Sequence, residues 1–134
     1  MTELPDYSGG FDPEFGHDKL SRGMLLELLK LYSQCAHTMD GFWYLTVMTK
    51  WGNDEAFDCD VKVWRKYQLY ETKVVSSLLN IHGDDVATVM KVIQATRPPR
   101  GTYDYEIDIK NNDHAIFTVL TCPTLFAIER GDRA

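Results

Sequence analysis

The sequence predicts an α+β fold in which a long antiparallel helical hairpin and a short helix pack on a small antiparallel β-hairpin. Two periodicities predict it: apolar residues recur every three or four positions through most of 18–96, and every second position over 103–121. The change falls at 97–101, where two prolines and a glycine interrupt helix and strand alike. We therefore expect one domain, with a helical part over 18–96 between an N-terminal arm, 1–17, and a C-terminal part, 97–134.

The arm carries three glycines, two prolines and spaced aromatic side chains, so we expect no regular structure there. Burial of an apolar ring stabilises a fold by about 1.5–3 kcal/mol, which predicts that the arm packs across the domain. A long helix is expected next, over about 20–51, with its apolar stripe facing the core. This stripe comprises Leu25, Leu28, Leu29, Tyr32, Cys35, Ala36, Met39, Trp43 and Val47.

Gly52 and Asn53 end this helix, and a second helix is expected over about 54–80. Because only a tight turn separates the two helices, they should lie side by side as an antiparallel hairpin. The alternation after the prolines predicts a β-hairpin, and a proline suits the first position of a helix. The remaining expected elements are a short helix over 85–95, strands over 103–109 and 115–121, and a last helix from Pro123 to Arg130.

Charge and composition exclude several classes of function. With 20 acidic and 14 basic side chains the net charge is −6, which argues against a nucleic-acid partner, because phosphate binding needs a clustered basic face. No apolar run reaches the ~20 residues of a membrane helix, and the N-terminus has no basic and apolar leader. The three cysteines form no CxxC pair, which fits a reducing compartment. We therefore expect a cytoplasmic protein without a membrane partner.

Two acidic side chains of the helical part are candidate catalytic residues. Asp40 lies in the most apolar part of the first helix, where Phe42 and Trp43 would partly desolvate its carboxylate and suit it to acid–base chemistry or metal ligation. Glu71 is the comparable acid of the second helix, and inward carboxylates on facing helices form the metal sites of helical bundles. The Glu-x-x-His spacing of such sites is absent, because position 74 is valine. A solvent-facing polar stripe explains Asp40 equally well.

His114 and Cys122 are candidate catalytic residues and candidate ligands of a divalent metal, since histidine and cysteine form a common ligand pair. Both lie on one expected strand, and a rise of ~3.3 Å per residue would separate them by roughly 26 Å. Cys122 also precedes the last helix, whose free N–H groups favour a thiolate. It is then expected to be the most reactive cysteine, with Cys35 buried and Cys59 slowed by neighbouring acids. A small buried side chain at a strand–helix junction is the alternative.

Four short segments together resemble one known family. They are Leu-Pro-Asp-Tyr-Ser-Gly at 4–9, Asp-Gly-Phe-Trp-Tyr-Leu at 40–45, the stretch 64–71, and Asp-His-Ala at 113–115 followed by Thr-Cys-Pro-Thr-Leu at 121–125. The family consists of small, uncharacterised cytosolic proteins from anaerobic bacteria and archaea. It is similar to the L-2-amino-thiazoline-4-carboxylic acid hydrolase family, whose namesake opens a small sulfur heterocycle.

The resemblance implies an α+β fold with a helical hairpin over a small antiparallel sheet, and a site that uses His114 and Cys122. It also implies a further C-terminal strand region with additional cysteines, which this chain is expected to lack. We therefore expect a hydrolase-like domain that acts on a small, sulfur-containing metabolite, with Asp40, Glu71, His114 and Cys122 at its site. The alternative is a non-catalytic domain that binds a small ligand, a metal or another protein. Helical hairpins with exposed aromatic strips commonly dimerise, so a homodimer is the expected assembly in that case.

Overall fold

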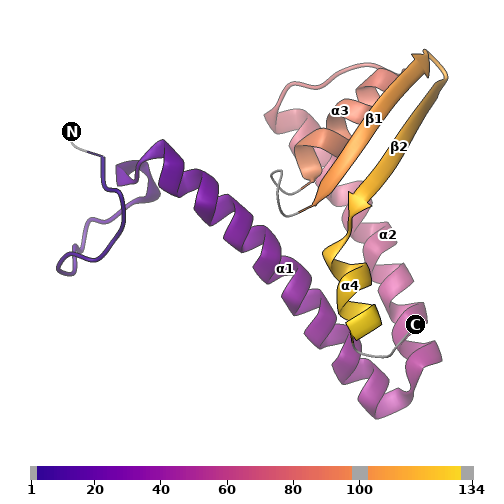
Figure 1. Ribbon diagram of the computed structural model, residues 1–134, viewed down its shortest axis with the longest axis horizontal. Helices are drawn as coiled ribbons and strands as arrows, with labels where there is room; N and C mark the ends of the chain where they lie inside the picture. The colour runs from indigo at the N-terminus through magenta and orange to yellow at the C-terminus, as the bar shows by residue number, and fades with distance from the viewer. Residues whose placement is uncertain (1–2, 98–102, 131–134) are drawn as a thin grey trace.

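The computed structural model describes residues 3–97 and 103–130, and it confirms the predicted α+β class (Figure 1). Long helices, a short helix and a two-stranded antiparallel sheet follow one another as expected, and each boundary lies within one or two residues of its predicted position. The predicted breaker at 98–101 lies outside the described residues. In chain order the elements are η1 (His17–Lys19), α1 (Arg22–Trp51), α2 (Asn53–Leu78), α3 (Val86–Thr96), β1 (Asp104–Asn111), β2 (His114–Thr121) and α4 (Pro123–Arg130).

Local sequence signals set both ends of α1. The hydroxyl of Ser21 accepts a hydrogen bond from the Met24 N–H at 3.2 Å, which satisfies one of the free donors of the first turn. The helix then continues unbroken through Gly41. It ends where Gly52 adopts a φ of +96° and its N–H bonds to the Met48 carbonyl at 2.9 Å. Gly52 also caps α2, so a single residue joins the two long helices.

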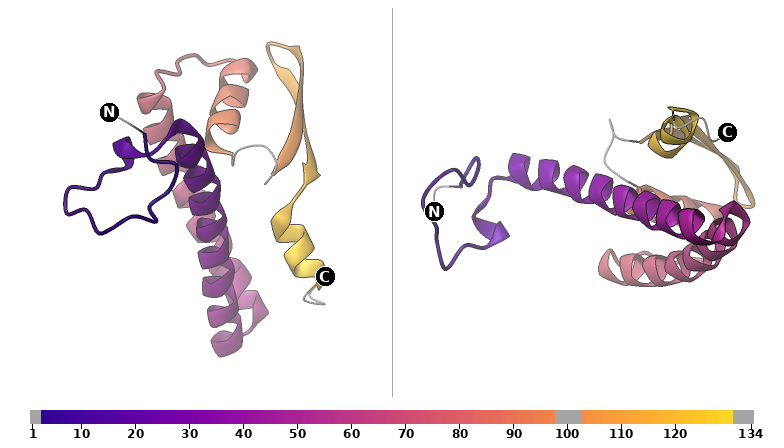
Figure 2. Two further views of the ribbon diagram at one scale, coloured as in Figure 1. Left: turned by 60° about the vertical axis from the view of Figure 1, so that its left-hand side comes forward. Right: turned by 90° about the horizontal axis from the view of Figure 1, so that it is seen from below.

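The two long helices meet at this turn and diverge beyond it (Figures 1 and 2). Next to the turn, Ala56 is fully buried and the Tyr44 hydroxyl donates a hydrogen bond to Asn53 Oδ1 at 2.8 Å. Away from it most of the expected apolar stripe of α1 is uncovered: Leu28 is half-buried, but Leu25, Leu29, Tyr32 and Met39 are exposed. The prediction that this stripe faces a core is therefore wrong, because α2 leaves α1 after the first few turns.

A second packed region joins α3 to the β-hairpin. The register pairs Tyr105 with Val119 and Ile107 with Phe117, so alternate side chains face α3, where Val92 is buried. The rings of Tyr105 and Phe117 lie 5.1 Å apart. At the other end the Val86 N–H donates to the Asn112 carbonyl at 3.1 Å, which ties the start of α3 to the hairpin turn. These contacts hold the hairpin along α3.

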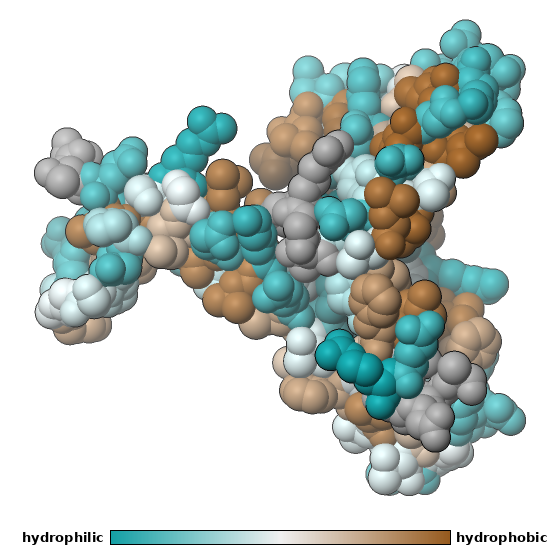
Figure 3. Space-filling model, in the orientation of Figure 1, coloured by the Kyte–Doolittle hydropathy of each residue, from teal (hydrophilic) through white to brown (hydrophobic). Residues whose placement is uncertain are grey.

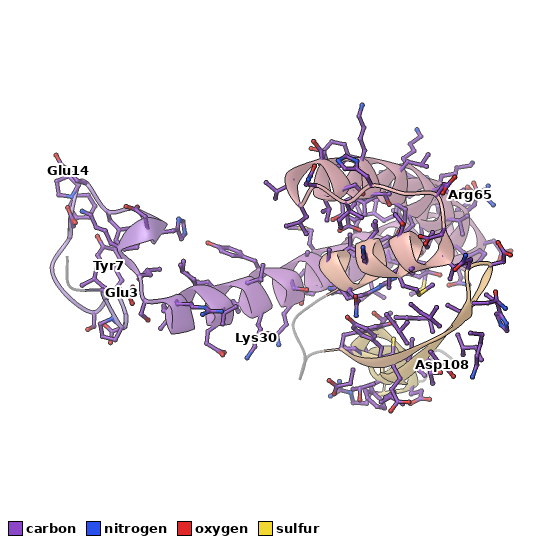
Figure 4. All side chains as sticks on the ribbon, turned by 90° about the horizontal axis from the view of Figure 1, so that it is seen from above. Glu3, Tyr7, Glu14, Lys30, Arg65 and Asp108 are labelled. Atoms are coloured by element: carbon purple, nitrogen blue, oxygen red, sulfur yellow. The ribbon has the colours of Figure 1, made fainter. Side chains whose placement is uncertain are left out.

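The N-terminal arm packs on the start of α1 and not across the domain, contrary to the prediction. The Leu4 N–H donates to the Lys19 carbonyl and the Ser21 N–H to the Leu4 carbonyl, both at 2.8 Å, and Leu20 is buried beneath them. Tyr7 and Phe15 stack at 4.1 Å. Figure 4 shows Glu3, Tyr7 and Glu14 at the far end of α1 from Arg65 and Asp108. The arm cannot reach the hairpin because α1 carries it away.

Within 3–97 and 103–130, no helix combines the length and the apolar character needed to cross a membrane.

The turn at Gly52 gives a test of this architecture. Gly52→Ala should lower the free energy of unfolding by about 1–3 kcal/mol, because its positive φ is strained for any residue with a Cβ atom. A Cβ at this position meets no atom within 4 Å, so the cost arises from the backbone alone. The measurement is chemical denaturation followed by circular dichroism.

Gly41→Ala is the matched control, because Gly41 lies inside α1 and a Cβ there also meets no atom within 4 Å. This substitution should raise the free energy of unfolding by about 0.5–1 kcal/mol through helix propensity. A Gly52→Ala variant at least as stable as the parent would show that the turn does not require its glycine.

Candidate functional site

Asp40 of α1 and Asp60 of α2 carry carboxyl groups whose charges interact across the two helices. Partial burial raises the pKa of the Asp60 carboxyl, and the negative charge of Asp40 raises it further, while a hydrogen bond from Trp64 acts in the opposite direction. Both aspartates are half-buried, and neither forms an ion pair with a described residue of the chain. Two neighbouring carboxyls, one of which has a raised pKa, form an arrangement that general acid–base chemistry can use.

A row of aromatic and acidic side chains continues from this pair along α2. Trp64 follows Asp60 by one turn, and its ring meets that of Tyr67 edge-on at 5.5 Å. The Tyr67 hydroxyl donates a hydrogen bond to Glu71 Oε1 at 2.9 Å. Burial and then this hydrogen bond raise the pKa of Tyr67. The row therefore presents a protonated phenol and a carboxylate on the same face as Asp60.

The predicted facing carboxylates, Asp40 and Glu71, are not the ones that the structure brings together. Glu71 lies 11 residues beyond Asp60, which is roughly 16 Å along the helix axis. Sequence reasoning missed Asp60 because it ends a run of acids, Asp54, Glu55 and Asp58, that resembles an ordinary charged surface. The spacing of Ala56, Asp60 and Trp64 places all three on one face of α2, and the small Ala56 marks the close approach to α1. That pattern is the signal that points to Asp60.

His114 and Cys122 lie at opposite ends of β2. His114 is exposed at the hairpin turn, opposite Asn111 in the register. Cys122 is half-buried and precedes α4, where its carbonyl accepts a hydrogen bond from the Phe126 N–H at 3.2 Å. Pro123 is the first residue of that helix, as predicted. Because β2 is continuous from His114 to Thr121, the structure does not bring the two candidate ligands to one point.

The described residues do not assemble a metal site by themselves. Among 3–97 and 103–130, no group of three or more histidine, cysteine or acidic side chains could hold an ion. Asp40 and Asp60 supply two carboxylates, whereas zinc sites use three or four protein ligands. The candidate divalent metal therefore does not fit the residues that the structure places together, and we derive no chemical step through one.

All three cysteines are free thiols, and their exposure differs from the prediction. Cys35 is exposed because the half of α1 that carries it stands clear of α2, so the prediction of a buried, inert thiol is wrong. Cys59 and Cys122 are half-buried. Exposure alone therefore favours reaction at Cys35.

Two surface hollows are present, and neither Asp40 nor Asp60 lines them. The larger, of about 670 Å³, runs beside the β-hairpin between Gln94 and residues of both strands. Its acidic lining residues are Asp104, Glu106 and Asp108, which alternate along β1. The smaller, of about 400 Å³, lies on α1 between Phe42 and Thr49. None of the four predicted site residues lines either hollow.

These features define an α+β protein with an open helical hairpin, an interhelical carboxylate pair and a β-hairpin that packs on α3. The chain belongs to a family of unknown function (DUF6125), whose model matches residues 18–132. The match begins after the arm and covers all four predicted site residues. No curated protein and no solved structure matches the chain.

The aspartate pair predicts a pH-dependent stability. A carboxyl whose pKa is raised on folding stabilises the folded state below its ordinary value of 3.8, and this contribution is lost as the pH rises through the folded value. At pH 7 the charged Asp60 carboxylate therefore lowers the free energy of unfolding. Asp60→Asn should raise the free energy of unfolding at pH 7 by less than about 1 kcal/mol, because solvent screens the pair. The difference in the free energy of unfolding between this variant and the parent should vanish below pH 3.8, the ordinary pKa of the carboxyl.

The control is Asp54→Asn, which removes an exposed carboxylate from the first turn of the same helix, where negative charge is favourable. That variant should be slightly less stable than the parent at pH 7. A carboxyl titration followed by NMR should also show a lower Asp60 pKa in Asp40→Asn. An unchanged Asp60 pKa would mean that the two aspartates do not interact.

Proposed function

We propose that this chain is an interaction domain that self-associates through the apolar surface of its long helices. The observation that carries the proposal is the distribution of burial. Within the described residues the buried hydrophobic side chains are Leu20 under the arm, Ala56 beside the turn and Val92 on α3. Each lies in a different part of the fold, so none forms a core for α1 and α2 along their length.

The exposed apolar side chains of α1 and α2 are numerous and large. Figure 3 shows apolar side chains along the visible face of α1, interrupted by polar ones. Soluble monomers rarely expose contiguous apolar patches beyond a few hundred Å², and larger patches mark interaction sites. On α1 and α2 they comprise Leu25, Leu26, Leu29, Leu31, Tyr32, Met39, Phe42, Trp43, Trp51, Phe57, Val63, Tyr67, Leu69, Tyr70, Val74 and Leu78.

A second copy is the occupant that we propose for this surface. The net charge of −6 opposes association of like chains, so the driving force in this proposal is burial of apolar side chains and not charge attraction. The helices themselves carry acids and bases in similar numbers, which keeps the local repulsion small.

Sedimentation velocity over a range of concentrations tests this proposal. The purified chain should sediment as a dimer that persists as the salt concentration rises, because salt screens charge interactions without weakening apolar contacts. A monomer at all concentrations would overturn the proposal. A dimer that dissociates in high salt would assign the association to ion pairs instead.

Hydrolase-like chemistry at Asp40 and Asp60 is a second proposal, and the interaction between these two carboxyls is the observation that favours it. In the hydrolysis of a cyclic thioimidate or amidine, one carboxylate would take a proton from the attacking water and the protonated partner would give one to the leaving atom. The resemblance to the thiazoline carboxylate hydrolases supports this substrate class. A cytosolic location belongs to the same proposal, supported by the three unpaired thiols.

Turnover of a 2-aminothiazoline acid tests the second proposal. Asp40→Asn and Asp60→Asn should each lower kcat by about 100-fold or more, which is the usual contribution of a general acid or base. Glu71→Gln is the control within the same helix and should retain activity. Absence of turnover by the parent chain would leave the interaction domain as the single surviving proposal.

A further inference from the structure

Building on the proposed self-association, we propose that α1 of one copy packs antiparallel on α1 of a second copy, crossing at Leu29 and Tyr32. The contact surface is one face of the helix, hereafter the α1 stripe. Its members recur at intervals of three and four residues and therefore lie on one side of α1. They are Leu25, Leu29, Tyr32, Ala36, Met39 and Trp43.

The α1 stripe is apolar, accessible and free of charge. Leu29 is 55% exposed, Tyr32 59% and Met39 68%. The ribbon views place the N-terminal half of α1 away from α2, α3 and the hairpin (Figures 1 and 2), so the chain does not cover the part of the stripe around Leu29 and Tyr32. The two charged side chains near its middle, Glu27 and Lys30, pair with each other at 2.8 Å on a different side of the helix.

Two opposite charges mark the ends of the α1 stripe. Arg22 and Asp40 are 18 residues apart, which is about five helical turns, so both flank the stripe on the same side. Antiparallel packing places Arg22 of each copy beside Asp40 of the other, at both ends of the contact. Parallel packing would instead place the equivalent Arg22 side chains, and likewise the Asp40 side chains, on opposite sides of the seam, where no such ion pair forms. Charge complementarity therefore selects the antiparallel arrangement.

The same charges set the register of the two helices. If Arg22 lies beside Asp40 of the second copy at both ends, the two-fold axis passes near position 31. Leu29 and Tyr32 of both copies then meet at the crossing, and Leu25 lies near Ala36 of the second copy. The arrangement also brings a guanidinium to Asp40 and Asp60, two carboxylates that have no ion-pair partner among the described residues of their own chain.

Cysteine cross-linking of the full chain tests both the surface and the register. In a background with Cys35, Cys59 and Cys122 replaced by serine, single cysteines are introduced as Leu29→Cys, Tyr32→Cys, Leu25→Cys or Met39→Cys and treated with a short bismaleimide. At a rise of 1.5 Å per residue, copies of position 29 or 32 lie within roughly 6 Å along the axis, and copies of position 25 or 39 are roughly 18–24 Å apart. We expect dimer bands for Leu29→Cys and Tyr32→Cys only.

A charge exchange provides the second measurement. Arg22→Asp and Asp40→Arg should each weaken the dimer by roughly tenfold, because each replaces two symmetric ion pairs by like charges. The double variant should recover most of the parental affinity, which a structural defect in either single variant would not allow. Helical content by circular dichroism confirms that each variant is folded.

The outcomes separate this inference from the proposed function. Cross-linking at all four positions would indicate parallel packing and overturn the antiparallel register while the self-association remains. A dimer that cross-links at none of them would exclude the α1 stripe as its surface. A parent chain that is monomeric at every concentration would overturn both proposals together.

Discussion

The backbone conformation of Gly52 is the constraint on which the rest of the molecule depends. Its φ of +96° ends α1 and starts α2 within a single residue, and so sets the direction in which the second helix leaves the first. Close contact is limited to the turns beside it, where Ala56 is buried and Tyr44 bonds to Asn53. Farther from Gly52 the two helices diverge. The exposure of Tyr32 and the distance of the arm from the β-hairpin follow from this divergence.

Because the long helices diverge, the folded chain is held by local contacts, and α3 lies against both α2 and the β-hairpin. The arm closes on the first turn of α1 through the backbone of Leu4, and α3 closes on the hairpin through Val92 and the bond from Val86. Such contacts order a few residues each, but they do not remove the apolar side of α1 from water. Association with a second copy would do so, which is why we connect the open hairpin to an assembly.

The same geometry relates the interaction surface to the candidate chemistry. Asp40 belongs to the carboxylate pair with Asp60 and also flanks the α1 stripe, so one side chain takes part in both proposals. A guanidinium from a second copy would favour the ionised forms of both aspartates. Under that arrangement, assembly and acid–base behaviour at this corner of the molecule are coupled, whereas His114 and Cys122 stay outside it.

The sequence by itself determined the elements, because their causes are local. The spacing of apolar residues and the capping residues predicted the bounds of α1, α3 and both strands to within one or two residues. Pro123 correctly predicted the start of α4. Only the tertiary structure decided which faces are covered. The periodicity of Leu29 and Cys35 predicted a core, yet both are exposed, and Asp60 rather than Glu71 interacts with Asp40. A repeating pattern states which residues share a side of a helix. What packs against that side depends on the direction in which α2 leaves Gly52, and the spacing of apolar residues does not specify that direction.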